Sequence, residues 1–128
     1  MDFKSNGIQH IGLPTNCFDE SCAFYKTLGF VCRYETVAPS GVRVAFYELD
    51  DSFMMEIYED SNVAGMSGAI NHVSIDCTDI ETAFASANAA GLKIVSDGIE
   101  ALPFWSNGVR FFIIEGPNKE RVEFCQVL

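Results

Sequence analysis

The order of apolar and polar residues predicts the same series of elements in both halves of the chain. Apolar residues that alternate with polar ones indicate a strand, and apolar residues spaced by three and four indicate a helix. Cys22, Tyr25 and Leu28 recur at helical spacing before Gly29, which predicts a helix from Asp19 to Leu28. The other elements expected in the first half are strands near residues 7–13, 30–37, 42–49 and 53–59.

The second half repeats this order. An Ala-rich run from about Asp79 to Ala90 predicts a helix that ends at Gly91. The strands expected around it lie at 69–76, 93–99, 108–115 and 120–127. Residues 61–68 are small or polar and indicate a linker. The pattern predicts an α+β fold of two βαβββ modules in tandem, with module one at 7–60 and module two at 69–128, in a single domain over 1–128.

Two histidines and two glutamates occupy matching positions in these modules. The segment Ile8-Gln9-His10-Ile11-Gly12-Leu13 aligns with Ile70-Asn71-His72-Val73-Ser74-Ile75, and Met55-Glu56-Ile57 aligns with Val122-Glu123-Phe124. The chain has only two histidines, and both stand in the same place of the repeat. Each module therefore contributes one imidazole from its first strand and one carboxylate from its last.

Strand alternation predicts where these side chains point. His72 shares a face with Ser74 and Asp76, opposite the more apolar face that a helix can cover. Glu56 and Glu123 each lie between apolar residues, where an unpaired buried charge costs on the order of several kcal/mol. A single histidine here is most simply a hydrogen-bonded structural residue, and a single glutamate is most simply solvated. The joint pattern instead favours a metal site made by His10, Glu56, His72 and Glu123.

Two imidazoles and two carboxylates suit a divalent first-row metal. Six-coordinate geometry leaves two positions for water or for two adjacent substrate oxygens. A metal that chelates a carbonyl oxygen and its neighbour stabilises an enediolate and makes the neighbouring C–H acidic. A carboxylate that leaves the metal can then act as the base. Glu123 is our first choice for this role and Glu56 the second.

Composition excludes several other classes of function. The net charge is −10, and only eight Lys and Arg are present, which argues against nucleic-acid binding. The five cysteines form no CxxC pair and indicate reduced thiols. No apolar run approaches the roughly 20 residues that cross a bilayer. We therefore expect a cytoplasmic protein that binds neither nucleic acid nor membranes.

Several segments resemble the vicinal oxygen chelate superfamily, which includes glyoxalase I, extradiol dioxygenases and bleomycin resistance proteins. The resemblance covers both modules and is strongest in Phe24-Tyr25-Lys26-Thr27-Leu28-Gly29-Phe30 and in Gly116-Pro117-Asn118-Lys119-Glu120-Arg121-Val122-Glu123-Phe124. It implies a cupped, barrel-like mixed sheet with helices on its outer face and a metal inside. It also implies a homodimer.

Within that superfamily the donor set is similar to that of glyoxalase I. This implies a lyase or isomerase that uses Ni, Co, Zn or Mn and transfers a proton through a metal-bound enediolate of a small α-hydroxycarbonyl, hemithioacetal or thioester. The glutathione-binding Arg and Asn of bacterial glyoxalase I are replaced by Pro14 and Asp60, so the substrate stays open. Alternatives are a methylmalonyl-CoA epimerase-like isomerase, a ring-cleaving dioxygenase, and a non-catalytic drug- or metabolite-binding protein.

Three further residues are candidates for the substrate pocket. Phe104 and Trp105 lie in the one stretch that makes module two longer, where they form either a lid or a packing contact. Arg110, like Arg43 in module one, either meets an anionic substrate group or is an exposed strand residue. Cys125 shares the strand face of Glu123, but no neighbouring base marks it as a nucleophile.

Overall fold

The structure is a computed structural model that describes residues 1, 4, 9–68 and 70–128. These residues form two compact units, Met1–Val63 and Ala64–Leu128. The predicted starts of two strands, residues 7 and 8 and residue 69, lie outside the described residues. No helix in the described part is long and apolar enough to span a membrane.

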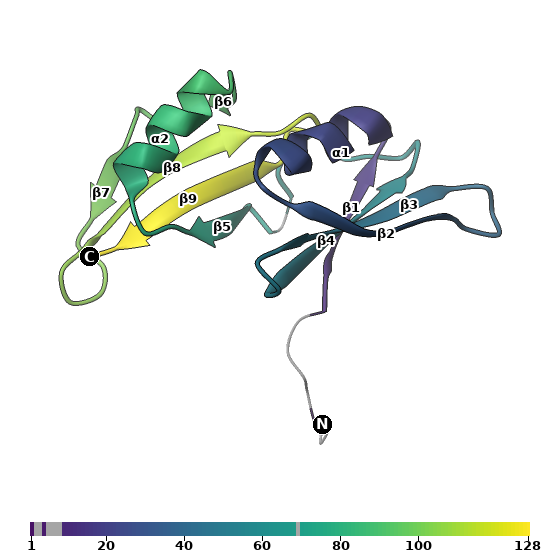
Figure 1. Cartoon of the computed structure of the whole chain (residues 1–128), viewed down its shortest axis with the longest axis horizontal. Helices are drawn as coiled ribbons and strands as arrows, with labels where there is room; N and C mark the ends of the chain where they lie inside the picture. Colours follow the sequence, from purple (N-terminus) through teal and green to yellow (C-terminus); the bar gives the residue numbers. More distant parts are fainter. Residues whose placement is uncertain (2–3, 5–8, 69) are drawn as a thin grey trace. The chain divides into compact units, whose positions relative to one another are not determined.

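The first unit is a four-stranded sheet with one helix. Its elements are β1 (Ile11–Thr15), α1 (Phe18–Thr27), β2 (Val31–Val37), β3 (Arg43–Leu49) and β4 (Phe53–Glu59). The strand order is β1-β4-β3-β2, with β1 parallel to β4 and the other neighbours antiparallel. Helix α1 packs on β3 and β4 (Figure 1).

The second unit repeats this arrangement. Its elements are β5 (His72–Asp76), α2 (Ile80–Ala89), β6 (Lys93–Ile94), β7 (Glu100–Leu102), β8 (Val109–Glu115) and β9 (Arg121–Val127). The main order is β5-β9-β8-β6, with β5 parallel to β9, and β7 also pairs with β8. Helix α2 packs on β9, β8 and β6 (Figure 1). The predicted α+β fold of tandem βαβββ modules is confirmed, while the single-domain boundaries stay a prediction.

The predicted strand at 93–99 is wrong beyond Ile94. The Ser96 hydroxyl, rather than a backbone carbonyl, accepts the hydrogen bond of the Ile113 N–H at 3.0 Å, and Gly98 has φ 85°. A side chain that replaces a ladder acceptor and a left-handed glycine both turn the backbone away from extended geometry. The Val95 N–H still donates to the Ile113 carbonyl oxygen at 2.8 Å, after which the backbone leaves β8 until β7 pairs with it.

Each helix covers the apolar face of its sheet. In β4, Met55 and Ile57 are buried while Glu56 between them is only half-buried. In the second unit, Phe112 stacks on Phe124 with ring centroids 5.0 Å apart and takes the edge of Phe84 from α2. Because side chains alternate along a strand, the residues between these core positions lie on the sheet face that the helix leaves uncovered. The candidate donors lie on those faces.

Candidate functional site

In the first unit, His10 and Glu56 face each other. His10 directly precedes β1, and its Nε2 lies 3.3 Å from Oε2 of Glu56 on β4. The Nδ1 side of the ring is hydrogen-bonded to the Gln9 side-chain oxygen, and the ring edge rests on Phe46, with centroids 5.5 Å apart. With its proton on Nδ1, the imidazole presents the Nε2 lone pair toward the carboxylate.

The second unit holds the matching pair. Nε2 of His72, the first residue of β5, lies 3.8 Å from Oε2 of Glu123 on β9. Nδ1 of His72 is 3.1 Å from the side-chain oxygen of Asn71. In the first unit the side-chain oxygen of Gln9 contacts Nδ1 of His10 in the same way. The Ser74 hydroxyl donates a hydrogen bond of 2.8 Å to Oε1 of Glu123. Glu123 is the least exposed of the four donors, at 17% of its side-chain surface.

The donor atoms of each pair suit a divalent first-row cation. Ligand bonds near 2.1 Å put neighbouring donor atoms about 3.0 Å apart at a right angle and about 3.4 Å apart in a tetrahedron. The separation in the first unit lies within that range, and the 3.8 Å separation in the second needs a small side-chain rotation. Among the described residues, no three His, Cys, Asp or Glu side chains form a metal-binding group. The predicted donors thus come together as two pairs, one in each unit.

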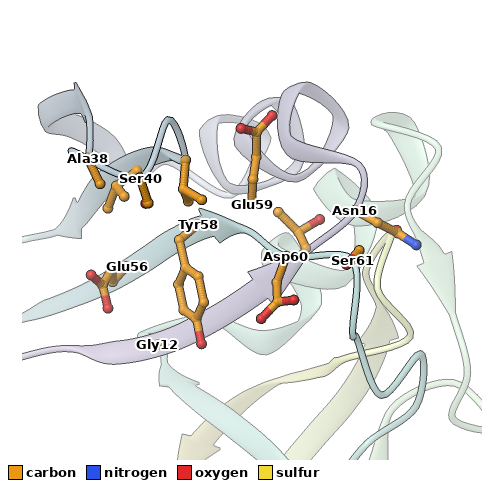
Figure 2. Close-up of a pocket in the computed structure, with 12 residues that line it drawn as sticks. Gly12, Asn16, Ala38, Ser40, Glu56, Tyr58, Glu59, Asp60 and Ser61 are labelled. Atoms are coloured by element: carbon orange, nitrogen blue, oxygen red, sulfur yellow. The ribbon is translucent and has the colours of Figure 1, made fainter.

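A hollow of about 830 Å³ adjoins the first pair. Glu56, Tyr58 and Asp60 come from β4 and the residue after it, and Figure 2 shows Tyr58 and Asp60 directed to one side while Glu59 is directed to the other. The twelve described lining residues include no Lys, Arg or His; they are Gly12, Thr15, Asn16, Ala38, Ser40, Val42, Val44, Glu56, Tyr58, Glu59, Asp60 and Ser61. The lining therefore combines apolar and hydroxyl-bearing residues, and all of its charged residues are acidic.

A second hollow, of about 610 Å³, lies in the other unit beside Ser74 and Cys125. Trp105 lines it, although 67% of this residue is exposed, and its backbone adopts φ 56°. Phe104 is 52% exposed and meets Trp105 edge to face, with centroids 6.1 Å apart. Both aromatic side chains reach solvent, and their proposed role at a substrate pocket stays a prediction.

The two arginines that match in the repeat are both engaged in ion pairs. Nη2 of Arg110 lies 2.5 Å from Oε1 of Glu81 on α2. Nε of Arg43 lies 2.9 Å from Glu59 and its Nη1 2.9 Å from Asp19. The substrate role considered for Arg110 stays a prediction, and the structure gives this guanidinium a partner on a helix.

The pKa of Glu59 is held below its ordinary value. Its carboxylate accepts a hydrogen bond from the Arg43 backbone N–H, which is the largest cause, and another from the Arg43 side chain. Hydrogen bonds to the ionised form of a carboxyl group favour that form. Glu59 therefore stays charged beside the hollow of the first unit.

Sequence reasoning did not single out Ser74 or Gly12. They hold the same place in the two modules and lie opposite the two glutamates, with Ser74 paired to Glu123 and Gly12 to Glu56. The signal that could have found them is the aligned repeat itself, in which the residue two positions after the histidine is glycine in module one and serine in module two.

Two βαβββ modules in tandem, each with a His–Glu pair on the face that its helix leaves uncovered, are the features with which we compare this chain to known families. The family described as the Glyoxalase/Bleomycin resistance protein/Dioxygenase superfamily matches residues 7–124. The chain belongs to this superfamily, which confirms the resemblance in the sequence.

Three known proteins are similar to this chain. YwbC of Bacillus subtilis (strain 168), described as uncharacterized, is 30% identical over 124 residues, which cover 93% of this chain and 96% of YwbC. The crystal structure of a glyoxalase family protein from Enterococcus faecalis has a TM-score of 0.77 at 18% identity, covering 94% of this chain and 97% of that one. The fosfomycin resistance protein FosX of Listeria monocytogenes, in complex with Mn(II) and sulfate, has a TM-score of 0.73 at 12% identity, covering 98% and 95%. At these identities the two structures establish the fold alone.

Proposed function

We propose that the protein is a metal-dependent, glyoxalase-like lyase or isomerase. His10, Glu56, His72 and Glu123 bind one divalent cation, for which Ni, Co, Zn and Mn are all suited. The observation that supports this most is the repeated pair, in which an imidazole Nε2 faces a carboxylate Oε2 in each unit. Histidines that served only for packing would have no reason to meet a glutamate in both units, on a face that no helix of the same unit covers.

The side chains have separate tasks in this reaction. A divalent ion supplies Lewis acidity, which makes the C–H beside a carbonyl more acidic. Glu56 or Glu123 takes the proton from that carbon and returns it to the adjacent one, so the substrate is isomerised without a net change in its atoms. Such general base catalysis is typically worth roughly 100- to 10,000-fold in rate.

The hollow of the first unit favours an uncharged substrate. Glu56 and Asp60 line it, and none of its described lining residues is basic. Two carboxylates in a partly enclosed space repel an anionic group and leave it unpaired. A small α-hydroxycarbonyl or the hemithioacetal of an uncharged thiol therefore fits better than a thiol peptide that carries several carboxylates.

Elemental analysis of protein purified without added metal tests the site. We expect one divalent ion per chain, and Co(II) titration of the metal-free protein should reach the same stoichiometry. Two ions per chain would mean that each pair acts alone, and no binding would overturn the proposed function. Co-expression of His10→Ala chains with His72→Ala chains tests whether one site takes its modules from two copies of a homodimer. Metal binding should be recovered in the mixed dimer only if it does, because one of its sites then keeps both histidines.

Solvent deuterium exchange tests the chemistry. In D2O, small hemithioacetals and α-hydroxycarbonyl compounds should gain deuterium at the carbon that loses its proton. Glu56→Gln and Glu123→Gln should each lower this exchange by at least 100-fold. Glu20→Gln, the same change at an exposed position on α1, should leave it unchanged. Equal exchange in all three variants would contradict a role for either carboxylate.

A further inference from the structure

Ser74 treats the two oxygens of Glu123 differently. Its hydroxyl is 2.8 Å from Oε1, while Oε2 is the atom that lies nearest His72, at 3.8 Å. Ser74 and Glu123 are directly paired across the parallel strands β5 and β9, so the contact is short and built into the strand register. One carboxylate oxygen is thus held and the other is presented beside the imidazole.

The same hydroxyl also contacts Cys125, whose Sγ is 3.2 Å from Oγ of Ser74. A serine hydroxyl has one proton to donate. Hydrogen bonds to an ionised acceptor are roughly twice as strong as neutral ones, so the proton goes to Glu123. The sulfur of Cys125 is then the weaker acceptor beside the same hydroxyl, and the carboxylate of Glu123 is the partner that the hydroxyl holds.

Among the described residues of the first unit, this contact has no counterpart. Gly12 occupies the place of Ser74 and is paired across the strands with Glu56. A Cβ at Gly12 would lie 3.4 Å from Oε2 of Glu56 and 3.5 Å from Cε1 of Tyr58. The glycine has no side chain with which to hold the carboxylate, and the neighbouring Tyr58 ring fills part of the space.

We propose that Ser74 is a positioning residue that fixes Glu123 as a one-oxygen metal ligand, whereas Gly12 offers Glu56 no such hydrogen bond. The inference rests on the proposed metal site. Outer hydrogen bonds of this kind orient a ligand before binding and typically change metal affinity by roughly 10- to 100-fold. Glu123 therefore stays in place, and Glu56, beside its own hollow, replaces Glu123 as our first choice for the carboxylate that leaves the ion and takes the proton.

Co(II) titration of metal-free Ser74→Ala, followed by visible absorption, tests this without any substrate. We expect Kd to rise by roughly 10- to 100-fold relative to the unmodified chain. Ser74→Thr keeps the hydroxyl and should restore the affinity. Thermal unfolding of the metal-free variants should give equal Tm values, because the side chain is exposed and the effect is on ligand orientation.

Gly12→Ala is the matched control in the first unit. Its Cβ is accommodated at ordinary contact distances, and no hydroxyl is removed, so the Kd for Co(II) should change by less than about threefold. An unchanged Kd in Ser74→Ala, with the unmodified chain binding Co(II), would overturn the inference alone. Failure of the unmodified chain to bind Co(II) would overturn the proposed metal site and this inference with it.

Discussion

Arg43 shows how much one side chain can connect. It begins β3, pairs with Asp19 on α1 and with Glu59 at the end of β4, and its guanidinium carbon lies 4.4 Å from the ring centre of Phe18. A planar guanidinium suits this combination because it donates in several directions and stacks on an aromatic face. Lysine would supply the charge without the geometry.

We expect Arg43→Gln to lower the Tm at neutral pH, and the difference from the unmodified chain to shrink in acid. The folded pKa of Glu59 is lowered, so its contribution to stability is fully present above its unfolded pKa, near 4.5. That contribution is lost as the pH falls through the lower folded value. Thermal unfolding at pH 7, 5 and 3 measures the effect.

Arg121→Gln is the control for this prediction. The Arg121 guanidinium is exposed and has no partner among the described residues, so its removal should change the Tm little at any pH. A Tm difference for Arg43→Gln that stays constant from pH 7 to pH 3 would contradict the assigned role of Glu59.

The sequence predicted positions better than contacts at this scale. Alternation around Glu56 and Glu123 was enough to place both between core residues, because strand geometry allows only two directions for a side chain. The bond from Ser74 to Glu123 depends on strand register and on a rotamer, neither of which a residue pattern contains. The ion pair between Arg110 and Glu81 could not be predicted for a similar reason, because it joins a strand to a helix that is distant in the sequence.

The two helices begin in different ways. Asp79 precedes α2, and its carboxylate accepts hydrogen bonds from the backbone N–H of Glu81 and Thr82, both at 3.1 Å. Cys17 precedes α1 and makes no side-chain capping bond. There the Thr15 hydroxyl accepts a hydrogen bond of 3.0 Å from the Cys17 N–H and is hydrogen-bonded to the buried Ser21 hydroxyl at 2.8 Å.

Asp79→Ala should therefore destabilise the second unit. It removes the acceptor for two otherwise unsatisfied helix N–H groups, and we expect the Tm to fall by roughly 3–6 °C. Asp97→Ala removes an exposed carboxylate outside any helix and serves as the control, with no change in Tm expected. Circular dichroism melting of the two variants measures the difference, and equal Tm values would contradict the capping role.

Helices and long strands followed from periodicity, and the short irregular strands did not. The helix ends agree within a residue of the predicted ones because glycine follows both helices closely in the sequence. The stretch from Lys93 to Ile99 reads as extended, yet its pairing depends on what the Ser96 hydroxyl does in the folded sheet. Side-chain acceptors that replace backbone acceptors leave no trace in an apolar pattern.

On the scale of the whole molecule, a bound ion should stabilise the fold. A ligand that binds only the folded state at about one hundred times its Kd adds about 2.7 kcal/mol. We expect excess Co(II) or Ni(II) to raise the Tm of the metal-free protein by roughly 5–15 °C, measured by calorimetry. His10→Ala/His72→Ala should show no such rise, and the same rise in that variant would contradict binding through the imidazoles.

The duplication was visible in the sequence because matching residues recur in matching order. The chemistry was less visible, since the superfamily to which the chain belongs covers several activities on one fold. The replacement of the glutathione-binding Arg and Asn by Pro14 and Asp60 leaves the substrate open, and in the structure Asp60 lines the same hollow as Glu56.

The difference between Ser74 and Gly12 shows how the two copies of a duplicated module can diverge. The donors His10, Glu56, His72 and Glu123 keep matching places in the two copies, while the residue two positions after each histidine does not. In the second copy a hydroxyl holds one carboxylate oxygen, and in the first copy the matching position has no side chain. A division of labour between the copies therefore needs only one substitution outside the donor set.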